Sequence, residues 1–342
     1  MDYVPEHAVW ELTLRCNMHC LHCGSSAGRA RSNELSIDEC FRVADELLEL
    51  GCRDITFIGG EVLLYRGWER VARRMVDGGV RANIITNAYS MGSEAIDKIL
   101  NAKLENVGVS LDGLEKTHDR IRRPGSFVKV LGAFEMLRRA QVPIGVVTTV
   151  LKPNIGELEA IYDLLLMNDV ELWQLQIATG MGNMAQQADL LLEPSDVSRI
   201  TKFIHEKSRT GDMHVIAGDD IGYFDEHEAY LRCQLGAISA WSGCKAGMRV
   251  IGIDSVGNVK GCLSIYSDDF IEGNVRTESL KSIWTKEGNF AYNRQFELSV
   301  LSGACAKCDK RSICRAGCRG SCFFNSGSLF ENRYCAYPRR PV

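Results

Sequence analysis

Three cysteines near the N-terminus have the clearest chemical potential in this sequence. Cys16, Cys20 and Cys23 are separated by three and then by two residues. Cysteine thiolates are the usual protein ligands of iron–sulfur clusters, and three of them can hold three corners of a four-iron cube. The fourth iron then keeps an open position for another molecule, as catalytic metal sites do. A structural zinc knuckle is the alternative, but a closed zinc site needs a nearby fourth ligand. The spacing therefore indicates a reactive cluster.

The distribution of cysteine supports this interpretation. The chain has 14 cysteines: five in the first 52 residues, none from 53 to 232, and nine from 233 onward. In a reducing compartment so many cysteines indicate metal or cluster ligation before disulfides. The gap between the two groups predicts a cysteine-poor domain with ligands at both of its ends.

Composition and charge exclude several classes of function. The 342 residues are 45% hydrophobic and 25% charged, which is typical of a globular protein with ample material for a core. A net charge of -4 gives no reason to expect nucleic acid as a partner. Neither a run of membrane-spanning length nor an export signal is present in the sequence. We therefore expect a cytoplasmic protein with no nucleic-acid or membrane partner.

Predicted strands and predicted helices alternate over about the first 200 residues, and these elements could position the first three cysteines. The predicted strands are β-branched and apolar runs, at Ala8–Leu14, Asp54–Ile58, Arg81–Thr86, Asn106–Leu111, Ile144–Val150 and Glu171–Ile177. The predicted helices have apolar residues at helical spacing, at Ile37–Leu50, Gly67–Asp77, Ser93–Asn101, Val128–Ala140, Ile155–Asn168 and Pro194–Ser208. This alternation predicts an α/β fold with parallel strands. Six units are too few for a closed eight-fold barrel, so we expect a partial (β/α)6 TIM-like barrel with its active site at the C-terminal strand ends.

The sequence after residue 210 predicts a bridging segment and a second domain. We expect the barrel over 1–210, an irregular bridge over 211–240, and a small cysteine-rich α+β domain over 241–342. That last domain starts with a hairpin candidate, Met248–Asp254 and Asn258–Cys262, turned at 255–257. Its last part, 300–342, is too polar to form a core alone, so bound clusters would have to organise it.

A glycine-rich motif follows the second predicted strand. In Gly59-Gly60-Glu61, two glycines permit close backbone approach and the carboxylate can accept from a ligand ammonium group. Together with the C-x3-C-x2-C loop, this motif resembles the radical S-adenosylmethionine (radical SAM) enzymes, which usually have proline where Val62 stands. The resemblance implies that S-adenosylmethionine binds the open iron and that Gly59, Gly60 and Glu61 bind its methionine amine.

Polar residues at other strand ends extend the resemblance. Thr86-Asn87 matches the family's Thr-Asn-Gly, with Ala88 replacing the glycine. Ser110 ends the fourth strand, and Gln176 lies near the end of the sixth, ahead of Gly180-Met181-Gly182. In the segment 117–127, Arg122 is favoured over Arg123 as partner of the cofactor carboxylate. The resemblance implies that Asn87, Ser110, Arg122 and Gln176 all face the cofactor.

The C-terminal cysteines have the spacing of a second family. They resemble the SPASM domain, which carries auxiliary clusters in many radical SAM enzymes, and the matching residues are Cys244, Gly257, Cys262, Cys305, Cys308, Cys314, Cys318 and Cys335. The resemblance implies that Cys305, Cys308, Cys314 and Cys335 hold one four-iron, four-sulfur (4Fe–4S) cluster. It also implies that Cys244, Cys262 and Cys318 hold part of another, which makes three clusters with the first.

The fourth ligand of that other auxiliary cluster stays open. Cys233 and Cys322 are both candidates, and the iron could instead be open to substrate. Cys40 and Cys52, on and after the first predicted helix, are interpreted as core residues.

The resemblance implies an enzyme rather than an electron carrier, since a carrier needs no Gly59-Gly60-Glu61. A flavodoxin or ferredoxin would supply one electron, and cleavage of S-adenosylmethionine would give a 5′-deoxyadenosyl radical. SPASM domains are commonest in maturases of ribosomally made peptides, so we expect a peptide substrate. The first strand starts by Ala8, so leader recognition would be direct or need a separate leader-binding protein.

The family resemblance also implies two other substrate classes. A dehydrogenase or epimerase of a small aminocyclitol or sugar is the alternative, because related enzymes also carry auxiliary clusters. A sulfatase-activating role is disfavoured, because such enzymes place an acidic base directly after the second SPASM cysteine, where this chain has Leu263.

Overall fold

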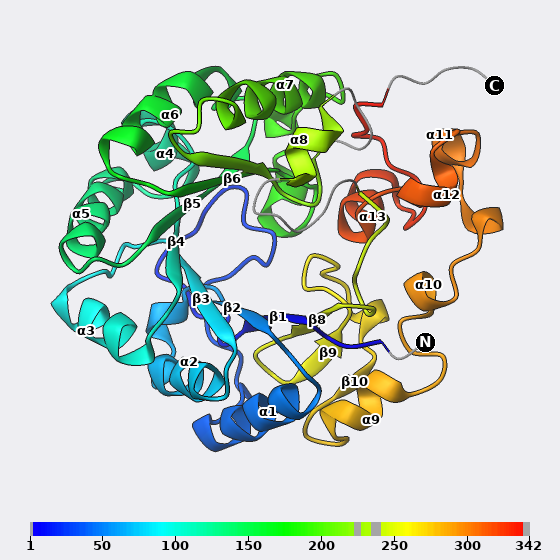
Figure 1. Cartoon of the computed structure of the whole chain (residues 1–342), viewed down its shortest axis with the longest axis horizontal. Coiled ribbons are helices and arrows are strands. Elements are labelled where there is room, and N and C mark those ends of the chain that lie inside the picture. The colour runs from blue at the N-terminus through cyan, green and yellow to red at the C-terminus, as the bar shows by residue number, and fades with distance from the viewer. Residues whose placement is uncertain (1–2, 222–226, 234–240, 338–342) are drawn as a thin grey trace.

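The computed structural model describes residues 3–221, 227–233 and 241–337 (Figure 1). One sheet runs through it, in the strand order β10-β9-β8-β1-β2-β3-β4-β5-β6-β7. Strands β8 and β1 to β7 are mutually parallel, and β9 and β10 are antiparallel additions at one edge. This is the α/β architecture of a partial TIM barrel with a cysteine-rich C-terminal region, as predicted.

The six strands predicted from the sequence are all present. They are β1 (His7–Glu11), β2 (Asp54–Ile58), β3 (Arg81–Thr86), β4 (Asn106–Ser110), β5 (Ile144–Val150) and β6 (Leu172–Ile177). Helices α1 (Ile37–Glu49), α2 (Trp68–Asp77), α3 (Ser93–Ala102), α4 (Glu115–Ile121), α5 (Ser126–Arg139), α6 (Leu158–Met167) and α7 (Asp196–Ser208) connect them and lie outside the curved sheet (Figure 1).

The sheet extends beyond the six barrel strands at both edges. β7 (His214–Ala217) pairs in parallel with β6, inside the segment for which the sequence predicted only an irregular bridge. It is followed by α8 (Glu228–Cys233). At the other edge the predicted hairpin is present as β8 (Val250–Ile253) and β9 (Asn258–Lys260), and β8 pairs in parallel with β1. The C-terminal hairpin thus continues the barrel sheet rather than standing apart from it.

The remaining C-terminal elements are short. They are β10 (Gly273–Asn274), α9 (Leu280–Thr285), α10 (Ala291–Arg294), α11 (Gly303–Ala306), α12 (Arg311–Cys314) and α13 (Arg319–Ser326). In Figure 1 they occupy the right-hand side, opposite α3 and α5. Short elements of this kind fit a region that bound clusters organise.

The core lies between the sheet and its helices. Trp10, Phe57 and Trp173 are fully buried on the strands, and α1 begins with a capping box formed by Ser36 and Glu39. Cys40 and Cys52 are buried, as predicted: burial raises the pKa of Cys40 to about 11 and that of Cys52 to about 12. Within the described ranges, no helix is long and apolar enough to cross a membrane.

Candidate active site

The loop after β1 carries the first three cysteines across the middle of the curved sheet (Figure 1). The backbone N–H of Met18 donates to the Cys16 sulfur at 3.4 Å, and that of Ala27 donates to the Cys23 sulfur at the same distance. Burial raises the pKa of the Cys20 thiol to about 12, against the opposing effect of the Arg122 charge. A coordinated metal deprotonates such a thiol outright. N–H donors aimed at sulfur and a nearby cation are what a bound anionic cluster needs, so these residues fit one.

Gly59 and Gly60 let the loop after β2 pack directly on this cysteine loop. The N–H of Gly60 donates to the Thr13 carbonyl at 2.7 Å, and that of Glu61 donates to the Arg15 carbonyl at 2.8 Å. A Cβ atom on Gly60 would lie 2.5 Å from the carbonyl oxygens of both Leu14 and Arg15. No side chain fits there, so the two glycines fix how closely the loops approach.

The Glu61 carboxylate is buried beneath that contact. It accepts from the Thr86 hydroxyl at 2.6 Å and from the backbone N–H groups of Asn87 and Leu63 at 2.8 and 3.1 Å. A carboxylate has about four acceptor positions, so one is left for a ligand ammonium group. Burial raises the pKa of Glu61, and these three donors oppose that rise.

Asn87 connects β3 to the cysteine loop. Its amide nitrogen donates to the Asn17 side-chain oxygen at 2.8 Å and lies 3.7 Å from the Cys16 sulfur. Ala88, which stands where the family has glycine, adopts a left-handed φ of 57°. The backbone shape expected of Thr-Asn-Gly is therefore kept despite the substitution.

The other strand-end residues lie on β4 and β6. Ser110 is the last residue of β4 and is buried. The Gln176 side chain, one residue before the end of β6, donates to the Thr149 hydroxyl at 3.1 Å. Both stand at the C-terminal strand ends, where the sequence predicted them.

Arg122 ends α4 beside the cysteine loop. Its Nε donates to the Asp112 carboxylate, which also accepts from His22 Nε2 at 3.0 Å. Asp112 is completely buried; burial alone would raise the pKa of Asp112, but the charges of Arg122 and His22 hold it well below its usual range. The carboxylate thus positions both side chains, leaving the outer guanidinium nitrogens of Arg122 for another anion.

Asp112, His22 and Asn183 are site residues that the sequence interpretation missed. Asn183 donates from its backbone N–H to the Cys23 carbonyl at 2.9 Å and from its side chain to the Cys20 carbonyl at 3.0 Å. The available signal was the position of each residue: His22 lies inside the cysteine loop, Asp112 is two residues after the end of β4, and Asn183 follows Gly180-Met181-Gly182.

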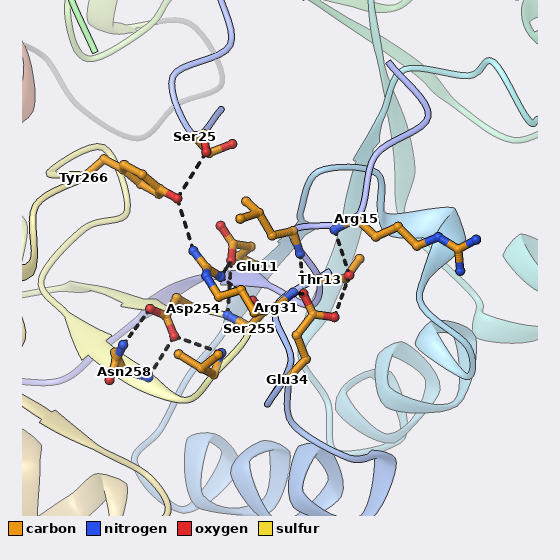
Figure 2. Close-up of polar contacts among 12 residues, drawn as sticks. Glu11, Thr13, Arg15, Ser25, Arg31, Glu34, Asp254, Ser255, Asn258 and Tyr266 are labelled. Atoms are coloured by element: carbon orange, nitrogen blue, oxygen red, sulfur yellow. Dashed lines mark hydrogen bonds and ion pairs between the residues drawn. The ribbon is translucent and has the colours of Figure 1, made fainter. Parts of the chain in front are cut away.

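A polar network joins the cysteine loop to the C-terminal hairpin (Figure 2). Arg31 donates to the buried Glu11 carboxylate at the end of β1, to the Ser255 hydroxyl in the hairpin turn, and to the Tyr266 hydroxyl. Tyr266 in turn donates to the Ser25 carbonyl at 3.2 Å. The segment just after Cys23 and the segment just after Cys262 are therefore held together.

The C-terminal cysteines form two groups. Cys244, Cys262 and Cys318 are neighbours. Burial first, and then Cys244, raise the pKa of Cys262 to about 11, and burial, Cys244 and Cys262 raise the pKa of Cys318 well above its usual value. Cys314 has a pKa raised by burial and by Cys335, Cys305 and Cys308, which define the second group. Three of these sulfurs accept a backbone hydrogen bond at 3.4 Å. Ser264 donates to Cys262, Lys310 donates to Cys308, and Asn332 donates to Cys305.

Cys233 and Cys322 are the predicted candidates for the fourth ligand beside Cys244, Cys262 and Cys318. Cys322 is fully buried and its thiol donates to the Ala316 carbonyl at 3.0 Å. Cys233 ends α8, but its side chain lies outside the described residues. In the parts of the chain that the structure describes, no three Cys, His, Asp or Glu side chains converge on a single metal ion.

Comparison with known families decides the class of protein. The Radical SAM superfamily matches residues 10–165, and the SPASM iron–sulfur cluster-binding domain matches residues 244–318. The chain is a radical SAM enzyme with a SPASM domain. These two families imply S-adenosylmethionine and iron–sulfur clusters as the cofactors of a radical SAM enzyme of this kind.

Several characterised radical SAM proteins are similar over nearly the whole chain. An AdoMet-dependent heme synthase of Methanosarcina barkeri is 29% identical, covering 98% of both chains. A mycofactocin maturase MftC of Mycobacterium ulcerans is 29% identical, covering 94% of this chain and 84% of its own. The structure of Streptococcus suis SuiB with S-adenosylmethionine superposes with a TM-score of 0.78 at 14% identity, covering 98% of this chain and 78% of that one. That likeness shows the fold.

Proposed function

We propose that this enzyme cleaves S-adenosylmethionine reductively to a 5′-deoxyadenosyl radical and oxidatively modifies a ribosomally made peptide. The modification would be a crosslink, a thioether, an epimerisation or a backbone excision. The observation that carries the proposal is the three-cysteine loop packed on Gly59 and Gly60, with two further cysteine groups in the C-terminal region. We expect a cytoplasmic enzyme that takes its electron from a flavodoxin or ferredoxin.

The proposal assigns each group of residues one task. Cys16, Cys20 and Cys23 hold the first cluster, and bound S-adenosylmethionine supplies the radical chemistry. Gly59, Gly60, Glu61, Asn87, Ser110, Arg122 and Gln176 hold S-adenosylmethionine, with Arg122 directed to its carboxylate because Asp112 already fixes the Nε side of the guanidinium. Cys244, Cys262 and Cys318 hold one auxiliary cluster, and Cys305, Cys308, Cys314 and Cys335 hold the other.

The cleavage reaction is tested with anaerobically reconstituted protein. Adding S-adenosylmethionine and dithionite should release 5′-deoxyadenosine, and replacing Cys16, Cys20 and Cys23 together by alanine should abolish this release. A matched control replaces Cys40 and Cys52, which are buried core cysteines outside the site. An intact protein with all its iron that releases no 5′-deoxyadenosine would refute the proposal.

The peptide substrate is supported by similar proteins. MftC is named as a maturase, and SuiB has been crystallised with its precursor peptide SuiA. A short precursor gene beside this one would supply the peptide to test, along with any separate leader-binding protein. The expected product is lighter than the precursor by two hydrogen atoms for a crosslink, or equal in mass for an epimer.

A second candidate function is a step of haem synthesis, because the match with a heme synthase covers 98% of this chain and 98% of that protein. The two candidates separate in one experiment with two arms, the precursor peptide and an iron porphyrin. Consumption of the porphyrin with formation of haem, and an unmodified peptide, would decide for the second candidate. The aminocyclitol or sugar alternative stays a prediction, tested by adding such substrates as a third arm.

A further inference from the structure

The short helix α10 contacts all three chain segments that carry Cys244, Cys262 and Cys318. The buried Asn293 side chain donates to the Ala246 carbonyl at 2.8 Å and accepts from Arg319 Nε at 3.0 Å. Ala246 lies two residues after Cys244, and Arg319 directly follows Cys318. Asn293 therefore ties two of the three cysteine segments to one helix.

Tyr292, the neighbour of Asn293, reaches the third segment. A Cβ atom on Gly261, the residue before Cys262, would lie 2.1 Å from the Tyr292 hydroxyl oxygen. The ring packs with the buried group of Trp241, Cys244, Ala246 and Cys314, and it meets Phe270 edge to face at 5.8 Å between ring centroids. The ring is thus fixed, and its hydroxyl lies among the cysteines rather than in solvent.

The Tyr292 hydroxyl is buried, and no described residue accepts a hydrogen bond from its O–H. The neighbouring Gly261 N–H can only donate to the phenol oxygen, so the hydroxyl proton stays available. Burying a hydroxyl proton without an acceptor is unfavourable, so an acceptor is needed here. Because the Tyr292 hydroxyl lies among the cysteines, a sulfur atom of the bound cluster would accept its hydrogen bond.

We propose that Tyr292 donates an O–H···S hydrogen bond to the auxiliary cluster held by Cys244, Cys262 and Cys318 and so raises the reduction potential of that cluster. The inference rests on the proposed assignment of these cysteines as its ligands. Hydrogen bonds to cluster sulfurs tune the potential, because they stabilise the reduced, more negative form more than the oxidised form. Tyr292 is then a positioning residue that sets how readily this cluster accepts an electron.

The test replaces Tyr292→Phe, which removes only the hydroxyl, in the reconstituted full-length enzyme. Potentiometric titration followed by electron paramagnetic resonance should show one cluster whose potential falls, while the other potentials stay unchanged. A tenfold change in the reduction equilibrium would appear as a fall of about 59 mV for one electron. In deuterated buffer, the reduced wild type should show an exchangeable proton coupled to that cluster, and Y292F should lack this coupling.

A matched control distinguishes this effect from the loss of any buried hydroxyl. Tyr162 on α6 also has a buried ring, and its hydroxyl lies 2.8 Å from that of Thr210, outside both C-terminal cysteine groups. Tyr162→Phe should change none of the cluster potentials.

Two outcomes would overturn the inference. If Y292F keeps all its iron and every potential and proton coupling, the hydrogen bond is not made. If Y292F loses iron instead, Tyr292 is merely structural. Failure of the cluster assignment itself is distinguishable, since Cys244→Ala would then leave the iron content and all spectra unchanged.

Discussion

At the scale of single residues, the site depends on backbone contacts that leave no room for side chains. Gly60 lies against two carbonyl oxygens of the segment that leads into Cys16. Because the atoms nearest to an added Cβ are all backbone atoms, the contact cannot relax by a rotamer change.

We therefore predict that Gly60→Ala displaces the cysteine loop. The added methyl would overlap the carbonyls of Leu14 and Arg15, so the reconstituted variant should hold less iron and release at least about tenfold less 5′-deoxyadenosine, equivalent to about 1.4 kcal/mol or more. The matched control is Gly132→Ala in α5, where a Cβ meets nothing within 4 Å. That change should keep the iron and stabilise the protein by about 0.5–1 kcal/mol. Full activity of G60A would contradict the prediction.

Long-range residues of the site could not be predicted from the sequence. The three cysteines and Gly59-Gly60-Glu61 were recognisable because their spacing is local. Asp112 was not, since its partners His22 and Arg122 reach it from two other segments and only the fold brings them together. Asn183 is similar: nothing in its own neighbourhood in the sequence shows that it contacts the Cys20 and Cys23 carbonyls.

At the scale of elements, the strands were predictable where apolar, β-branched residues alternate over five or more positions. The four-residue strand β7 was missed, since it is too short for such a pattern and begins with the exposed His214. The pairing of β8 with β1 was missed for another reason. The local pattern of a strand predicts that it will pair but does not identify its partner.

The network of Figure 2 should couple the cysteine loop to the β8–β9 hairpin energetically. Glu11 is only 4% exposed, so its pairing with Arg31 is shielded from water. A double-mutant cycle of Glu11→Gln and Arg31→Met, measured by denaturant unfolding of the reconstituted protein, should give a coupling free energy of about 1–3 kcal/mol. The exposed Asp45–Arg74 pair between α1 and α2 is the control, with less than about 1 kcal/mol expected. Equal couplings for the two pairs would contradict the prediction.

At the scale of the whole molecule, one sheet joins the first cysteine group to part of the C-terminal region. The first group follows β1, and Cys262 follows β9 two strands away. The proposed ligands of the first cluster and those of the auxiliary clusters are therefore separate residues within one continuous framework.

Because the proposed ligand sets are separate, cleavage of S-adenosylmethionine should be separable from modification of the substrate. Replacing Cys305 and Cys308 by alanine should leave 5′-deoxyadenosine release within about twofold of wild type, a change of less than about 0.5 kcal/mol in the barrier. Modification of the substrate should stop, which mass spectrometry of the peptide would measure. Loss of both activities, in a variant that still holds the first cluster by iron analysis, would show that the groups are not independent.

The pairing of β1 between β2 and β8 also has a consequence for how the chain is made. β1 is synthesised long before β8, so its second edge stays open until Val250–Ile253 has been synthesised. An open edge is a template for pairing with other chains, and domains fold in the order of their synthesis. A shortened chain that ends before β8 would thus expose the strand leading into the cysteine loop, so such fragments should aggregate during translation rather than accumulate as a folded barrel.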